Sequence, residues 1–174
     1  NNSINNTDKI FIILSEISSQ SIDVIPPDIN ISDSKFTIHE NKILYGLSAL
    51  KGVGEESMIE LVTNRKEKGA YKSLVDFNKR LSRSVLNKRQ IEKLILSNSF
   101  KSIHEDISKL YTNVENIIQK KDENSLFLDE DDSQFFLNKK LVKIDQIDAE
   151  FESYGFLYSQ KKQTSLLSKL NLNS

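Results

Sequence analysis

The stretch Lys51-Gly52-Val53-Gly54-Glu55 decides the fold of this chain, because two glycines flank a single aliphatic residue. Apolar residues recur at helical spacing on both sides of it, in residues 47–50 and 58–62. Glycine allows the backbone to turn sharply and another backbone to approach closely. The pattern therefore predicts a helix, a tight hairpin and a second helix, with Val53 packed into the core between the two helices.

The hairpin also predicts a place for an anion. The amides of Gly52 and Gly54 would lie at the start of the second helix, where free N–H groups and the helix dipole favour phosphate. Such an element grips the nucleic-acid backbone without reading sequence. Lys51 favours this interpretation, whereas Glu55 and Glu56 would repel a phosphate. The alternative is that the Gly-x-Gly turn only ends one helix and begins the next.

Composition narrows the class of protein. The chain has 174 residues, 37% of them hydrophobic and 28% charged, which suits one domain with an extension or two small domains. The absence of cysteine excludes disulfides and thiolate metal sites. There is no signal peptide and no apolar run long enough to span a bilayer, so we expect a cytoplasmic protein with no membrane partner. Because the first residue is Asn1, we expect part of a longer protein.

The small net charge hides an uneven distribution. Residues 41–101 contain thirteen basic and six acidic side chains, whereas residues 105–150 contain twelve acidic and six basic ones. A basic segment raises the local affinity for polyanions such as nucleic acid. The alternative is a Lys-rich surface that is simply solvated.

Turn and cap residues predict the elements around the hairpin. Thr7 or Asp8 is expected to cap a helix that ends near Ser19, and Gly69 is expected to end the helix after the hairpin. Ser73 and Asn87 are expected to cap two further helices. The remaining elements predicted are a strand at 22–25, a β-hairpin of 35–38 with 42–45, one long helix through 103–118 and a last helix over 144–158.

The two helices capped by Ser73 and Asn87 form a second helix-loop-helix unit, without glycines. Its loop and the start of its second helix contain Arg83, Lys88 and Arg89. Together the two units would hold a duplex backbone in two places.

The acidic half contains a candidate docking peptide, Glu123-Asn124-Ser125-Leu126-Phe127. An exposed aliphatic-aromatic pair in a flexible segment often enters a partner's pocket. The alternative is that Leu126 and Phe127 fold back on the domain. The run of acidic residues 129–132 is expected to be exposed and mobile, because like charges favour solvent over a packed core. The alternative is a divalent-metal loop, although the spacing and the glycine of a calcium loop are missing.

Taken in order, these segments resemble the late fingers and tandem helix-hairpin-helix region of the alpha subunit of bacterial DNA polymerase III, the replicative C-family polymerase. The resemblance is carried by Ile25-Pro26-Pro27-Asp28-Ile29-Asn30, Ile43-Leu44-Tyr45-Gly46-Leu47-Ser48-Ala49-Leu50-Lys51-Gly52-Val53-Gly54-Glu55, Leu74-Val75-Asp76-Phe77, Asn87-Lys88-Arg89-Gln90-Ile91-Glu92-Lys93-Leu94-Ile95 and Glu152-Ser153-Tyr154-Gly155-Phe156-Leu157-Tyr158-Ser159.

The resemblance implies a mainly α fold with a small β-hairpin and four segments. Residues 1–45 would end the fingers domain, and residues 46–121 would form the tandem helix-hairpin-helix domain. Residues 122–143 would be an acidic flexible segment with a clamp-binding peptide. Residues 144–174 would be a linker helix toward a missing oligonucleotide-binding domain.

The resemblance also implies sites and partners. The partners would be duplex primer-template DNA, the sliding clamp (beta subunit) and other polymerase III holoenzyme subunits. The catalytic carboxylates and their Mg²⁺ would lie in the parent polymerase's palm, so neither catalytic residues nor cofactors are expected in this chain. The implied DNA-binding residues are Lys51, Gly52, Val53, Gly54, Arg83, Lys88 and Arg89, and the implied clamp-binding residues are Glu123 (where the family has Gln), Ser125, Leu126 and Phe127.

Two other functions stay open at this point. The chain could be an interaction scaffold that does not bind DNA and uses only Leu126 and Phe127. It could also be a small hydrolase or nuclease, which would need clustered acids or a pair of histidines on one face. His39 and His104 are far apart in the sequence, and we find no such cluster.

Overall fold

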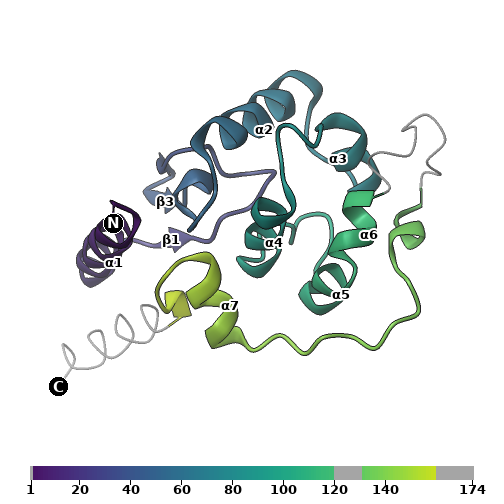
Figure 1. Ribbon diagram of the computed structural model, residues 1–174. Coiled ribbons are helices and arrows are strands. Elements are labelled where there is room, and N and C mark those ends of the chain that lie inside the picture. The colour runs from purple at the N-terminus through teal and green to yellow at the C-terminus, as the bar shows by residue number, and fades with distance from the viewer. Residues whose placement is uncertain (1, 120–130, 160–174) are drawn as a thin grey trace.

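The computed structural model of this chain describes residues 2–119 and 131–159 and is mainly helical, as the sequence predicts (Figure 1). The elements, with η for a 3-10 helix, are α1 (Asn2–Ser19), β1 (Val24–Ile25), β2 (Thr37–His39), β3 (Lys42–Leu44), η1 (Leu47–Ala49), α2 (Glu55–Lys68), α3 (Leu74–Arg80), α4 (Lys88–Leu96), α5 (Ile107–Thr112), α6 (Val114–Gln119), η3 (Asp132–Phe135) and α7 (Gln146–Ser153).

A small sheet with the strand order β1-β3-β2 lies beside the helices. The predicted β-hairpin is present, because β2 and β3 pair antiparallel with Ile38 opposite Ile43. Its turn is formed by Glu40 and Asn41, which both have positive φ, as a tight two-residue turn requires. β1 adds to β3 in parallel, with Val24 opposite Ile43.

Helix α4 is the centre of the helical part. It packs against α5, α6 and α7, which surround it in Figure 1. Its apolar side, which includes Ile91 and Leu94, is buried. One hydrophobic cluster runs from Leu14 in α1 through these residues to Phe156 after α7. Burial of this apolar surface is the main force that holds the elements together.

The helix before the glycines is shorter than predicted. Only η1, a single 3-10 turn over Leu47–Ala49, precedes the hairpin. Leu50 then takes an extended conformation and ends the turn, although both Leu47 and Leu50 are buried. The apolar spacing therefore marks core positions correctly, but it does not extend over enough residues to make an α-helix.

The predicted long helix through 103–118 is wrong, because α5 ends and α6 begins around Asn113. The Asn113 side chain donates to the Lys109 carbonyl at 2.9 Å and accepts from the Leu137 N–H at 2.9 Å. Asn113 is almost fully buried, so its amide bonds the backbone of both α5 and the returning chain. A buried side chain that bonds to the backbone in this way competes with the helical pattern.

Part of the acidic run is also ordered. The Asp132 carboxylate accepts hydrogen bonds from the N–H groups of Leu74 and Val75, at 3.1 and 3.0 Å. It therefore caps α3 together with Ser73, whose side chain accepts from the Asp76 N–H. For this residue the expectation of an exposed, mobile run is wrong.

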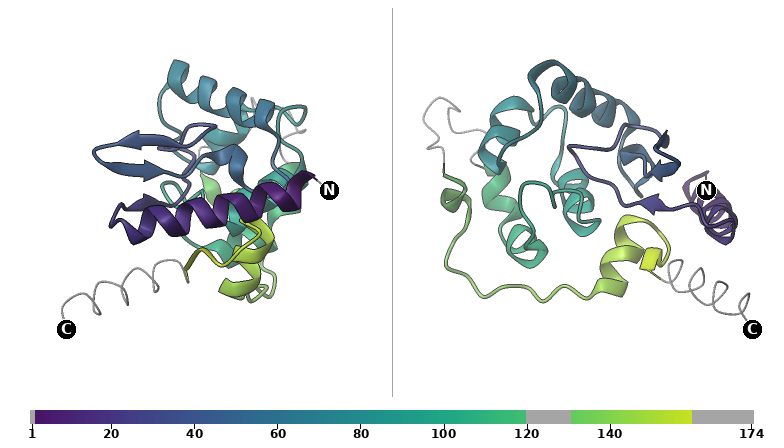
Figure 2. Two further views of the ribbon diagram at one scale, coloured as in Figure 1. Left: turned by 90° about the vertical axis from the view of Figure 1, so that its left-hand side faces the viewer. Right: turned by 180° about the vertical axis from the view of Figure 1, so that it is seen from behind.

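The two ends of the described chain lie together. Helix α1 begins at Asn2 rather than after Thr7, and the Thr7 side chain lies against Gly155. After η3 the chain runs extended along one edge and brings α7 back to α4 and to the region of β1 and α1 (Figure 2). Helix α7 is shorter than predicted and begins at Gln146, after the Asp145 cap.

Candidate nucleic-acid interface

The hairpin between η1 and α2 has the geometry that its glycines permit. Gly52 has φ of 74°, a conformation that residues with a Cβ rarely adopt. The Val53 N–H donates to the Leu50 carbonyl at 3.3 Å and closes the turn. Val53 is half-buried and packs against the hydrophobic cluster, as predicted. Gly54 is the N-cap of α2, so the hairpin leads directly into that helix.

The start of α2 has no side-chain cap, because Gly54 has no side chain to offer. The helices α3, α4, α5 and α7 differ, since each has a side-chain cap, from Ser73, Asn87, Asp106 and Asp145 respectively. The first N–H groups of a helix have no partner within the helix. Those of α2 are therefore available to an external acceptor, and the helix dipole favours a negative one.

The start of α4 lies beside the start of α2. The Gln90 side chain donates to the Ser57 hydroxyl at 3.0 Å, which joins the first turns of the two helices. The Arg89 guanidinium lies against the hairpin, since a Cβ on Gly52 would be 3.3 Å from its Nη2 atom. Arg89 itself is exposed. The unit formed by η1, the hairpin and α2 therefore contributes free amides. The unit formed by α3 and α4 contributes the Arg89 cation beside the same hairpin.

The charge of Glu55, one of the two acidic residues beside the hairpin, is partly neutralised. Glu55 forms an ion pair with Lys35 at 3.0 Å, on a surface where both side chains are exposed. An exposed pair of this kind contributes little to stability. It does, however, reduce the repulsion between the Glu55 carboxylate and an anion at the start of α2. This repulsion was the argument from the sequence against phosphate binding at the hairpin.

The predicted DNA-binding residues are not all in one place. Lys51, Gly52, Gly54 and Arg89 come together at the hairpin. Lys88 and Arg83 instead reach α6. The Lys88 ammonium donates to the Glu115 carboxylate at 2.6 Å, and this bond raises the pKa of Lys88. The Arg83 guanidinium donates to the Ile118 carbonyl at 3.1 Å.

Two arginines of the basic segment serve the fold. Arg65 donates to the carbonyls of Ile29 and Ser32, each at 2.7 Å. Arg80 bonds the end of α2 and the loop after it, with the Gly69 carbonyl at 2.7 Å. Their side chains are only 10% and 9% exposed. The excess of basic residues in the sequence therefore overstates the positive charge that the surface offers to a polyanion.

An ion pair at the hairpin has no signal in the sequence. Lys93 in α4 pairs with Glu152 at the end of α7, with Nζ and Oε2 2.6 Å apart. The N–H of Lys51 also donates to the carbonyl of Ser153 at 2.7 Å. The end of α7 is thus part of the surface around the hairpin, although it is far away in the chain.

The implied clamp-binding residues Glu123, Ser125, Leu126 and Phe127 lie outside the described residues. Their proposed role therefore stays a prediction.

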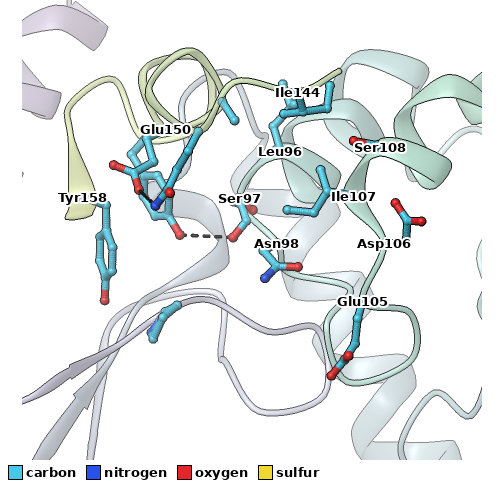
Figure 3. Close-up of a pocket in the computed structure, with 14 residues that line it drawn as sticks. Leu96, Ser97, Asn98, Glu105, Asp106, Ile107, Ser108, Ile144, Glu150 and Tyr158 are labelled. Atoms are coloured by element: carbon cyan, nitrogen blue, oxygen red, sulfur yellow. Dashed lines mark hydrogen bonds between the residues drawn. The ribbon is translucent and has the colours of Figure 1, made fainter. Parts of the chain in front are cut away.

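A separate hollow lies at the C-terminal end of α4, whereas the hairpin meets the start of that helix (Figure 3). It has a volume of about 530 Å³ and includes Glu105, Asp106 and Glu150 among its lining residues. Glu150 accepts hydrogen bonds from the Ser159 N–H and hydroxyl, each at 2.9 Å. The carboxylates make this hollow unsuitable for phosphate, which leaves the hairpin as the better candidate.

Within residues 2–119 and 131–159, no three carboxylate or imidazole side chains gather as metal ligands. None of the helices described there is long and apolar enough to cross a membrane.

In a comparison with known protein families, residues 21–110 match the helix-hairpin-helix motif family. The chain is similar to the DNA polymerase III subunit alpha of Deinococcus radiodurans, with 39% identity over 99 residues that make up 57% of this chain and 7% of the relative. The same subunit of Haemophilus influenzae is 36% identical over 123 residues, 70% of this chain and 11% of the relative. That of Borreliella burgdorferi is 33% identical over 118 residues, 68% and 10%.

The chain thus spans about a tenth of the length of these relatives. The match to the motif family and the similarity to these relatives agree with the resemblance to the helix-hairpin-helix region of DNA polymerase III alpha subunits. That prediction from the sequence is confirmed.

Proposed function

The chain belongs to the helix-hairpin-helix motif family, and on this premise we propose that it is a non-catalytic DNA-binding segment of a DNA polymerase III alpha subunit. It would hold the phosphate backbone of duplex primer-template DNA during replication. The similarity to three polymerase III alpha subunits supports this assignment. Polymerisation itself, with its Mg²⁺, would belong to the rest of the longer enzyme.

One observation supports the proposal most strongly. The uncapped start of α2 and the Arg89 guanidinium of α4 meet at Gly52 and Gly54. Amides would bind phosphate oxygens through hydrogen bonds, and the guanidinium would add charge and further donors. Lys51 stands beside them on the exposed turn. These contacts carry no sequence information, which suits an enzyme that copies any template.

The binding strength follows from the number of phosphates contacted. With about three phosphates neutralised, the slope of log K against log salt should be close to −3 for duplex DNA. Affinity should therefore be modest and should fall steeply with salt. In the whole polymerase such a contact would slow dissociation between nucleotide additions.

Fluorescence anisotropy of a labelled primer-template duplex across a salt series tests the proposal. Arg89→Gln should weaken binding and make the slope less steep by about one. The matched control is Lys68→Gln, at the far end of α2 and about 20 Å from the hairpin by helix rise. It should bind like the wild type. If the wild type fails to bind at low salt, or if both variants behave alike, the hairpin is not the DNA contact.

We further propose that Glu123, Ser125, Leu126 and Phe127 tether the chain to the sliding clamp. This part rests on the family resemblance, in which the Leu-Phe end fills a hydrophobic pocket. A Leu126→Ala/Phe127→Ala variant should lose binding to purified clamp while keeping its affinity for DNA. The opposite result, DNA binding lost and clamp binding kept, would contradict the assignment. Clamp binding without any DNA binding would instead favour an interaction scaffold.

A further inference from the structure

The end of α7 is fixed to the hairpin by its backbone. The Lys51 N–H donates to the Ser153 carbonyl at 2.7 Å, so one amide of the hairpin is already used. Helix α7 also packs directly on α4. The carbonyl end of a helix carries partial negative charge. The negative end of α7 thus borders the position at the hairpin where we propose that phosphate binds.

Glu152 adds a full negative charge at the same end of α7. Its carboxylate is 2.6 Å from the Lys93 ammonium. The hydrogen bond from Lys93 lowers the pKa of Glu152, and the nearby charges of Lys51 and Arg89 lower it further. The carboxylate therefore lies in the combined field of three cations, two of which belong to the candidate interface.

The two partners differ in exposure. The Lys93 side chain is 10% exposed, whereas that of Glu152 is 62% exposed. A Lys of such low exposure needs an anionic partner, because an unpaired charge away from water is costly. A carboxylate that is largely in solvent can move aside at little cost. A phosphate oxygen could then take its place beside the ammonium.

We propose that Glu152 competes with DNA phosphate for Lys93, so that α7 acts as an acidic brake on duplex binding. The proposal rests on the function proposed above and names a residue that sets its strength. In the free protein Glu152 neutralises Lys93 and opposes the charges of Lys51 and Arg89. When DNA binds, Lys93 exchanges the carboxylate for a phosphate. The brake keeps the contact weak enough for the duplex to move.

Anisotropy with the same primer-template duplex tests this. Glu152→Gln keeps the shape of the side chain and removes its charge. One unit charge about 6 Å from a phosphate in a water-like dielectric changes affinity by about threefold. We expect Glu152→Gln to bind about threefold more tightly at low salt, and the gain should shrink as salt screens the charge.

The control for net charge is Glu67→Gln, an exposed carboxylate near the far end of α2. It lies well beyond a Debye length of about 10 Å from the hairpin and should change affinity little. Adding Lys93→Met to Glu152→Gln should abolish the gain in affinity, and circular dichroism should show that every variant keeps its helices. The brake is overturned if Glu152→Gln gains no more than Glu67→Gln. If Arg89→Gln weakens binding while Glu152→Gln changes nothing, only the brake fails; if no variant binds DNA, the proposed function fails with it.

Discussion

Arg80→Lys should destabilise the protein although it keeps the charge, because the guanidinium has more partners than an ammonium can reach. All three nitrogens of Arg80 donate hydrogen bonds, and its side chain is only 9% exposed. The group also lies over the Tyr71 ring, 4.3 Å from the centroid. The acceptors are the Asn64 side chain at 2.8 Å, the carbonyls of Asn64, Gly69 and Ala70 at 3.0, 2.7 and 3.3 Å, and the Asp76 carboxylate at 3.1 Å.

The size of the effect follows from the bonds that Lys cannot replace. An ammonium concentrates its donors at one point, so at least two of the carbonyl bonds are lost. At about 1.5 kcal/mol for each bond to a charged donor, the free energy of unfolding should fall by about 3 kcal/mol. For a chain of this size that corresponds to a Tm lower by about 6–12 °C.

Urea unfolding followed by circular dichroism measures this change. Arg89→Lys is the matched control, because Arg89 is exposed, and its effect should stay within about 0.5 kcal/mol. DNA binding of Arg80→Lys, measured well below its Tm, should equal that of the wild type. A loss below about 1 kcal/mol, or a large loss in the control as well, would refute the assignment of Arg80 to the fold.

Two substitutions and one titration test other parts of the structure. Asp132→Ala removes both of its hydrogen bonds to the start of α3 and should cost about 1 kcal/mol in urea unfolding, as loss of an N-cap does. Gly46→Ala should cost at least about 2 kcal/mol in the same assay, because the new Cβ would lie 2.5 Å from the Lys35 carbonyl carbon and 2.6 Å from the Phe36 nitrogen. Burial lowers the pKa of His104, so its NMR titration should have a midpoint below 6.5; its contribution to stability should be full above pH 6.5 and be lost as pH falls through that midpoint, and a midpoint at or above 6.5 would contradict this.

The parts of the fold that depend on neighbours in sequence could be predicted. Ser73 and Asn87 cap helices as expected, because an N-cap bonds to an N–H only three residues away. Gly69 ends α2, and the glycines of the hairpin lead into it, for reasons equally local to the backbone. The helix type, the caps and the turn therefore follow from short stretches of sequence.

What failed depends on contacts across the chain. The break at Asn113 is accompanied by its bond to Leu137, which no periodicity in residues 103–118 records. Asp132 is ordered because it meets α3 from a distant part of the chain. The domain boundaries predicted at residues 45, 121 and 143 remain a prediction.

The candidate site was only partly visible in the sequence for the same reason. The glycines and Lys51 form one motif and could be named together. That Arg89 reaches Gly52, whereas its neighbour Lys88 turns to Glu115, depends on which face of α4 meets α2 and which meets α6. Charge counts gave no sign that Glu152 lies among these cations.

The central claim is that the amides of the hairpin and Arg89 contact the phosphate backbone. The most direct test is a titration of the ¹⁵N-labelled protein with a short duplex at low salt, followed by amide NMR shifts. We predict that the signals of Gly52 and Gly54, together with the side-chain Nε of Arg89, shift the most and return when salt is raised. Shifts confined to another surface, or no shifts at these groups when DNA is bound, would contradict the account.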